Sequence, residues 1–408
     1  MGGALGTGAV WNRRSSCGIF FTKKVFDLKT AFIASLILAT NALYLEIGRY
    51  LVIDMVFSFF LVSALFLFYL AVNEEKNRTK NFLLFYLSLA LAFLTKGPAA
   101  IAITALTGTA YLLFTKRLKT VAREMRWGWG LTIFFTVTLP WFVDISLRQP
   151  DFLNFFFLHE HVQRFISGHF EHQEAWFFYL VWVPLAFVPW ALFPKPFLEN
   201  FCSLTAARDS KRTELFLLIV AAGVLVFYSL SQSKLITYVL PSFPFISIFI
   251  ARGWVLWEEK TNNVNIGRYF YAMISVLAVI SLAVCLAMEK MNVNYTTKPF
   301  AQFLKPKLEK NDAVFIYDHP GAFYDFGFYL DFPVKLVGLE GELELFRKDK
   351  DASHVSVTKE EFAKKLRGHA RIFCLMRKSD YDGLDTSVRR NLSLINQDNR
   401  KVLVESRP

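Results

Sequence analysis

The sequence predicts an α-helical multi-span membrane bundle of about nine spans, followed by a small α/β domain. Of its 408 residues, 54% are hydrophobic and 17% aromatic, which is too apolar for a soluble protein of this size. Long apolar runs alternate with short basic loops up to about residue 289. Beyond that point the apolar runs shorten to the length of buried strands, which indicates a change of fold.

Nine apolar stretches carry the prediction of the bundle. A helix needs about 20 residues to cross a bilayer, so only the third stretch is clearly short. The stretches are 29–46, 53–72, 82–94, 98–114, 128–147, 175–193, 214–230, 235–253 and 268–288.

The region 82–114 is too long for one helix and is interrupted by Thr95-Lys96-Gly97-Pro98. Pro98 removes a backbone donor and Gly97 loosens the turn. We therefore expect two spans joined by a tight polar turn.

Loop charge supports this division. With a cytoplasmic N-terminus, 15 basic residues fall on one side of the membrane and 5 on the other, as the positive-inside rule requires. Merging 82–114 into one span would reverse all later loops. The first group is Lys76, Arg78, Lys80, Lys116, Arg117, Lys119, Arg123, Arg126, Lys195, Arg208, Lys211, Arg212, Arg252, Lys260 and Arg268; the second is Arg49, Lys96, Arg148, Arg164 and Lys234.

This topology predicts a multi-pass membrane protein. Asp54, Lys96, the loop 159–172, Lys234 and everything after residue 289 fall on the non-cytoplasmic side. The net charge of +12 then reflects cytoplasmic loops and contact with membrane lipids, and no nucleic-acid partner is expected. The four cysteines are too scattered for a disulfide framework or a metal site, and Cys374 should be an unpaired thiol.

The C-terminal segment predicts a small α/β domain on the non-cytoplasmic side. Short apolar runs at 313–318, 334–339 and 371–376 are typical of buried strands. Thr358 and Glu361 form a capping box that opens a helix near 358–367. We expect three segments: an atypical, truncated N-terminus (1–28), a transmembrane domain (29–289) and a soluble domain (290–408).

Asp54 and Lys96 are the first candidate site residues. A carboxylate at the start of a span and a lysine between two spans suit a cavity that receives a phosphate. A helix-end cap for Asp54 and a lysine that snorkels to the headgroups are the alternatives.

The loop that leads into the span at 175–193 carries four of the seven histidines, with Arg164 among them. An arginine beside a histidine suits phosphate oxygens, because the guanidinium forms forked hydrogen bonds. A divalent cation held by the histidines and a solvated loop without a role stay open as alternatives. The residues are His159, Glu160, His161, Arg164, His169 and His172.

Lys234 and Tyr238 are spaced i and i+4, which places them on one face of a helix. They either line a cavity beside the lipid or anchor the helix at the interface.

Together these motifs resemble the membrane glycosyltransferases that use polyprenyl-phosphate sugars. The motifs are FLTKGP, the EH-x2-RF loop followed by W-x2-Y and PW, and SK-x2-TYVLP-x2-PF. The aminoarabinose transferases that modify lipid A are the most similar type, and the protein O-mannosyltransferases are more distant. The resemblance covers residues from about 25 to 290. The C-terminal domain is similar only in its general type.

The resemblance implies a GT-C fold and inverting transfer of a sugar from undecaprenyl phosphate to an acceptor such as lipid A or an envelope glycan. It implies that Asp54 is the catalytic carboxylate. Lys96, His159, Arg164, Lys234 and Tyr238 would surround the donor phosphate, with Glu160 and His161 as further cavity residues. Developing negative charge on the leaving phosphate needs such cations.

Family members also carry a first periplasmic loop with an Asp-Glu pair and a Glu-Lys-Pro motif, which this sequence lacks. It is therefore expected to be a shortened member whose own activity is in question, and whether it uses a metal stays open. The alternatives to an enzyme are an inactive lipid-binding scaffold and a transporter of lipid-linked sugars. A transporter should show an inverted repeat with paired broken helices, and only the break at 96–98 is found.

Overall fold

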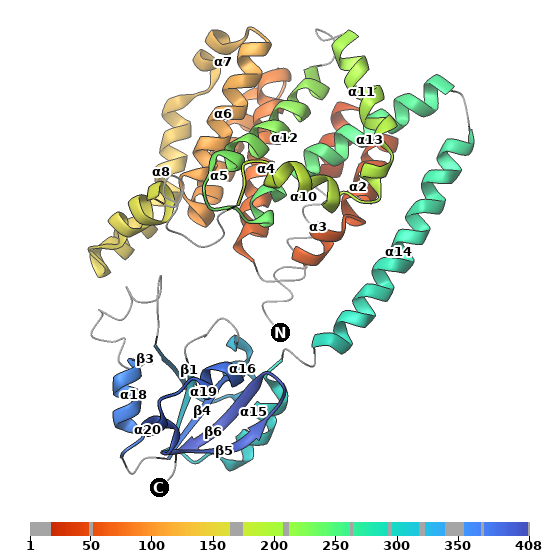
Figure 1. Cartoon of the computed structure of the whole chain (residues 1–408). Coiled ribbons are helices and arrows are strands. Elements are labelled where there is room, and N and C mark those ends of the chain that lie inside the picture. Colours follow the sequence, from red (N-terminus) through yellow and green to blue (C-terminus); the bar gives the residue numbers. More distant parts are fainter. Residues whose placement is uncertain are drawn as a thin grey trace. The chain divides into compact units, whose positions relative to one another are not determined.

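The computed structural model forms two compact units, Met1–Leu282 and Ala283–Pro408. It describes residues 18–48, 52–163, 174–206, 212–261, 264–292, 296–317, 323–338, 355–368 and 371–406. Each unit is considered by itself below. Figure 1 shows the first as a helical bundle and the second as a mixed sheet with helices.

The first unit is built from helices. A helix at residues 18–25 precedes the numbered elements. These are α2 (Leu28–Ala39), α3 (Ala42–Ile47), α4 (Ile53–Asn73), α5 (Arg78–Lys96), α6 (Ala99–Phe114), α7 (Leu118–Glu124), α8 (Trp127–Arg148), the π-helix η1 (Asn154–Gln163), α10 (Phe178–Ala186), the 3-10 helix η2 (Trp190–Leu192), α11 (Pro194–Ala206), α12 (Arg212–Leu230), the 3-10 helix η3 (Ile236–Ser242), α13 (Phe243–Thr261) and α14 (Val264–Asn292), which runs into the second unit.

Four segments of the described chain are long and apolar enough to cross a membrane: α4, α8, α12 and the continuous segment of η3 and α13. The helices α4 and α13 are mostly buried within the bundle, whereas most of α8 is exposed. A helix that is apolar all round and buried forms a bundle core, and an exposed apolar helix in such a protein faces lipid.

The turn between α5 and α6 confirms that 82–114 forms two helices. Gly97 has a positive φ of 63°, a conformation that glycine adopts without steric cost, and α6 starts at Ala99 immediately after Pro98. The two chain segments therefore reverse direction within two residues.

Two of the expected spans are not single helices. The stretch 29–46 divides into α2 and α3, because the Asn41 side chain accepts a hydrogen bond from the Tyr44 backbone N–H and starts a new helix. The stretch 175–193 divides into α10 and η2. Pro184 and Pro189 account for this division, because proline cannot donate a helical hydrogen bond.

The second unit contains a six-stranded sheet in the order β3-β2-β1-β4-β6-β5. The first four strands in this order are parallel, and β6 and β5 continue the sheet in antiparallel fashion. The strands are β1 (Ala313–Tyr317), β2 (Val334–Val337), β3 (Ser356–Val357), β4 (Ile372–Arg377), β5 (Leu392–Gln397) and β6 (Lys401–Ser406).

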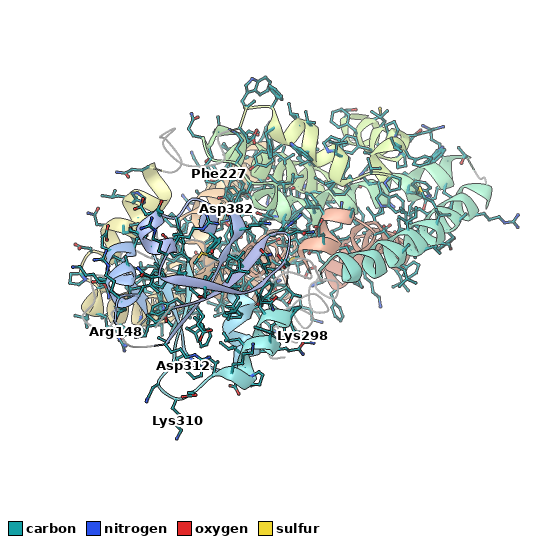
Figure 2. All side chains as sticks on the ribbon, turned by 60° about the horizontal axis from the view of Figure 1, so that its bottom comes forward. Arg148, Phe227, Lys298, Lys310, Asp312 and Asp382 are labelled. Atoms are coloured by element: carbon teal, nitrogen blue, oxygen red, sulfur yellow. The ribbon has the colours of Figure 1, made fainter. Side chains whose placement is uncertain are left out.

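Both faces of this sheet are apolar and covered. Along β4, Phe373 and Leu375 belong to one buried cluster, whereas Cys374 and Met376 belong to another, as the two-residue period of a strand requires. Lys310, in the turn before β1, extends into solvent (Figure 2). The covering helices are α15 (Lys298–Leu304), η4 (Lys305–Lys307), α16 (Tyr324–Leu330), α18 (Lys359–Lys365), α19 (Lys378–Asp382) and α20 (Thr386–Arg389).

The predicted strands at 313–318, 334–339 and 371–376 are confirmed as β1, β2 and β4. The predicted capping box is also confirmed. The Thr358 hydroxyl accepts from the Glu361 backbone N–H, and the Glu361 carboxylate accepts from the Thr358 N–H, at the start of α18.

Cys374 should be chemically inert in the folded protein. Its side chain is fully buried and burial raises the pKa of the thiol well above its ordinary value, so the reactive thiolate is scarce. Cys202 on α11 is exposed.

In single-cysteine variants, maleimide should label Cys202 rapidly and Cys374 only after unfolding. Equal labelling rates in the native protein would contradict the burial of β4.

Candidate functional site

Asp54, Lys96 and Tyr238 meet at one end of the bundle. The Lys96 ammonium forms an ion pair with the Asp54 carboxylate, and its Nζ lies 3.9 Å from the centroid of the Tyr238 ring. The Phe57 ring lies 5.7 Å away from the same Nζ. An ammonium over an aromatic face is attracted by the negative face of the ring. The lysine is thus held by a carboxylate and two rings.

Helix ends explain why these residues meet. Asp54 lies in the first turn of α4 and Lys96 is the last residue of α5, and α4 packs against both α5 and η3, which carries Tyr238. A carboxylate at a helix N-terminus and a cation at a C-terminus are both favoured by the helix dipole. The side chains of Asp54 and Lys96 are 9% and 21% exposed, so the pair is largely removed from solvent.

Lys234 lies in the extended segment before η3 and is also buried. The prediction that it shares a helix face with Tyr238 is wrong, because η3 begins only at Ile236. Its Nζ donates a hydrogen bond to the Glu174 backbone carbonyl over 2.8 Å. Burial lowers the pKa of Lys234 below its ordinary value, because the charged form is poorly solvated there. The structure therefore places Lys234 next to the chain that enters α10, and no described contact joins it to Lys96.

His159 lies in η1 and is exposed, with its ring stacked on Phe155 at 5.0 Å between centroids. The neighbouring Phe157 packs against Phe93, one turn before Lys96, with 6.4 Å between ring centroids. The element η1 therefore lies beside the end of α5 that carries the ion pair.

The other residues of the histidine-rich loop are outside the described structure. The side chains of Glu160 and His161 and the whole of Arg164, His169 and His172 are not described. Within the described part of the chain, no group of three or more His, Cys, Asp or Glu side chains is placed to hold a metal ion.

Two tyrosines near the ion pair were not predicted. The Tyr179 hydroxyl donates to the Leu235 carbonyl over 3.0 Å, and the Tyr228 ring packs against Tyr238 with 5.2 Å between centroids. The Tyr228 hydroxyl is buried and has no hydrogen-bond partner among the described residues. Both tyrosines lie within electrostatic reach of Asp54. Tyr228 lies six residues before Lys234. Its position near the end of an apolar span was the sequence feature that could have indicated a site residue.

Comparisons with known proteins agree with this architecture. Residues 9–143 match the family model of dolichyl-phosphate-mannose-protein mannosyltransferases. The chain is 30% identical over 263 residues to an undecaprenyl phosphate-alpha-4-amino-4-deoxy-L-arabinose arabinosyl transferase of Aeromonas hydrophila, covering 63% of this chain and 47% of that protein.

A transferase of the same description from Proteus mirabilis is 32% identical over 259 residues, covering 61% of this chain and 45% of that protein. The chain thus spans less than half the length of these curated relatives in the matched region.

Solved structures show the same fold. The crystal structure of ArnT from Cupriavidus metallidurans bound to undecaprenyl phosphate matches 99% of this chain and 83% of that chain, with a TM-score of 0.81 and 21% identity. Its apo structure matches with a TM-score of 0.80. The fold is therefore the GT-C fold of membrane glycosyltransferases. In its matched regions the chain is thus similar in sequence to aminoarabinose transferases and to the protein mannosyltransferase family model.

The two tyrosines provide a matched test of the site's geometry. Tyr179→Phe should lower the thermal unfolding midpoint, because the Leu235 carbonyl loses its donor, at a cost of about 1 kcal/mol. Tyr228→Phe should leave the midpoint unchanged or raise it, because it removes a buried hydroxyl without a partner. Thermal unfolding of the detergent-solubilised variants measures both, and the reverse order would contradict these contacts.

Proposed function

We propose that the chain forms the donor site of an inverting glycosyltransferase, which moves a sugar from a polyprenyl phosphate to a lipid or glycan acceptor such as lipid A. The ion pair of Asp54 and Lys96 beside Tyr238 carries the proposal, because it sets a half-buried lysine at the end of a membrane bundle. The resemblance to transferases named for undecaprenyl-phosphate aminoarabinose, and to an ArnT structure bound to undecaprenyl phosphate, supports it.

The chemistry requires a cation at this place. When the bond between the anomeric carbon and the phosphate oxygen breaks, negative charge grows on the lipid phosphate that leaves. A cation fixed in a site of low dielectric stabilises that charge more strongly than it would in water. Lys96 has this position, and its contact with the Tyr238 ring keeps it there.

Each predicted residue then has a proposed role. Lys96, with the Tyr238 hydroxyl, binds the donor phosphate. Asp54 holds Lys96 until the phosphate arrives and then faces the sugar as the catalytic carboxylate. Lys234 secures the strand-like segment before η3 through the Glu174 carbonyl. The remaining residues are assigned to the same cavity as proposals: His159 and Arg164 at the phosphate, and Glu160 and His161 at its wall.

The site end of the bundle is proposed to face the periplasm. Basic side chains lie mostly in the loops at the other end, where α7 and the N-terminus of α12 are found, and such loops are normally cytoplasmic (Figure 1). The second unit, which follows α14, is then a periplasmic domain. The multi-pass membrane character itself is supported by the relatives and by the apolar helices.

Lys96→Ala should weaken binding of undecaprenyl phosphate by about tenfold or more. A hydrogen bond to a charged group contributes about 1.5–3 kcal/mol, and 1.4 kcal/mol corresponds to tenfold. Native mass spectrometry of the chain in lipid nanodiscs, titrated with undecaprenyl phosphate, measures this.

Lys195→Ala is the matched control, because its Nζ also lies over an aromatic ring, 4.7 Å from the centroid of Trp257 at the far end of α13. Equal loss in both variants, or no loss in either, would contradict the assignment.

Asp54→Asn separates binding from transfer. The variant should bind undecaprenyl phosphate at least as tightly as the native chain, because a carboxylate that competes for Lys96 is removed. Sugar transfer to lipid A, followed by mass spectrometry in cells that express the enzyme, should be abolished without loss of expression. Full transfer by this variant would rule out Asp54 as the catalytic carboxylate.

A further inference from the structure

A second polar site lies among the apolar helices of the bundle, and its lining does not include Asp54 or Lys96. A cavity of about 30 Å³ lies between the helix at residues 18–25 and the helices α2, α3, α4 and α13. Its walls combine hydroxyl groups with aromatic and aliphatic side chains, and none of its described lining residues is charged. The lining residues that bear a hydroxyl are Thr22, Ser35, Tyr44, Ser58, Ser63 and Ser247.

Three of these hydroxyls are buried without a partner among the described residues. Thr22, Ser58 and Ser247 are each 1% exposed, and none of their hydroxyl oxygens has a hydrogen-bond partner in the part of the chain that the structure describes. They come from three separate helices: the one at residues 18–25, α4 and α13. A buried hydroxyl without a hydrogen bond destabilises the folded protein, so three such groups around one cavity indicate that something in the cavity bonds to them.

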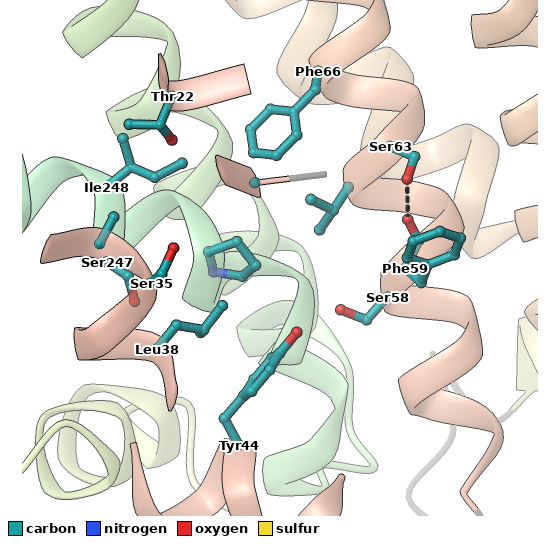
Figure 3. A pocket seen from close by; sticks show the side chains of 14 residues that line it. Thr22, Ser35, Leu38, Tyr44, Ser58, Phe59, Ser63, Phe66, Ser247 and Ile248 are labelled. Carbon is teal, nitrogen blue, oxygen red and sulfur yellow. Dashed lines mark hydrogen bonds between the residues drawn. The ribbon is translucent and has the colours of Figure 1, made fainter. Parts of the chain in front are cut away.

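The other serines of the cavity behave differently. Ser35 donates to the Ala31 carbonyl over 2.8 Å, and Ser63 donates to the Phe59 carbonyl over 2.7 Å, which is the usual way for a serine to satisfy itself within a helix. Ser58 and Ser247 also lie inside helices and do not form this bond. Figure 3 shows the Ser58 and Tyr44 hydroxyls directed into the space between α4 and the wall that carries Thr22 and Ser247.

The size and chemistry of the cavity select its occupant. A single water molecule needs about 10–15 Å³ of cavity volume. The cavity of about 30 Å³ therefore has room for about two water molecules. A pyranose ring or a lipid headgroup is larger, and the absence of charge from the described lining disfavours a phosphate. A buried water normally makes two to four hydrogen bonds to polar groups that otherwise lack partners, as these three hydroxyls do.

We propose that this cavity is a water-binding site, in which about two ordered waters bridge Thr22, Ser58 and Ser247 and so join three helices by hydrogen bonds. Ser58 follows Asp54 by one helical turn on the same face of α4. The waters therefore fix the helix that carries the carboxylate, at the turn next to it. This role does not depend on the reaction that the chain catalyses.

Removal of a hydroxyl should lower the thermal unfolding midpoint if the cavity holds water and should not lower it if the cavity is dry. Ser58→Ala, Ser247→Ala and Thr22→Val should each lower the thermal unfolding midpoint of the full chain in detergent, by about 2–4 °C, because the waters lose a partner. Ser35→Ala is the matched control from the same cavity and should change the midpoint less, because its hydroxyl already bonds its own helix. The double variant of Ser58 and Ser247 should lose less than the sum of the single losses, because both hydroxyls share the same waters.

Midpoints that rise or stay unchanged in Ser58→Ala and Ser247→Ala would show a dry cavity and overturn the proposal. Ser58 and Ser247 lie on different helices. If one variant fails to fold, the other variant still tests the proposal. A neutral lipid alcohol that co-purifies with the native chain in native mass spectrometry, and is lost from both variants, would also overturn it in favour of a lipid occupant.

Discussion

The buried ion pair between Asp54 and Lys96 is the interaction on which the site end of the bundle depends. Two charges withdrawn from water are costly unless each finds its counterpart. Here the cost is offset by the opposite charge, by two helix dipoles and by the ring of Tyr238. The pair also joins the start of α4 to the end of α5, and η3 packs against α4 with its tyrosine over the lysine. This group of contacts therefore holds the start of α4, the end of α5 and the element η3 together at the proposed ligand site.

Charged side chains at the opposite end of the bundle are also paired. Arg117 donates to the Val72 carbonyl over 2.8 Å and to the Asn73 side chain over 3.2 Å, and Asn73 in turn donates to the Tyr111 hydroxyl over 3.1 Å. The bond to Val72 satisfies a carbonyl in the last turn of α4, where a helix has acceptors without partners. Arg78 pairs with the Glu124 carboxylate over 3.0 Å. The pair of Asp54 and Lys96 differs in that the ring of Tyr238 lies against its cation.

Local signals predicted much of the structure. The Gly97-Pro98 turn and the Thr358–Glu361 capping box depend on a few adjacent residues, and both were found from the sequence. Hydropathy alone did not divide 29–46, because Asn41 caps a helix inside an apolar run. The strands β5 and β6 were not found either, since Leu392–Gln397 alternates only weakly between apolar and polar residues. Asp54, Lys96 and Tyr238 were singled out individually, but their contact depends on how α4, α5 and η3 pack. The three unpaired hydroxyls of the cavity come from distant segments, so only the fold could bring them together.

The most direct test of the central claim is whether the lipid phosphate approaches the Lys96 ammonium. Solid-state NMR can measure the dephasing of lysine ¹⁵Nζ signals by the ³¹P nucleus of bound undecaprenyl phosphate, with the Lys96 signal assigned from its loss in Lys96→Met. The account predicts strong dephasing of the Lys96 signal when the lipid is bound. A Lys96 signal that the bound lipid leaves unchanged would contradict the account, because the phosphate would then be bound elsewhere.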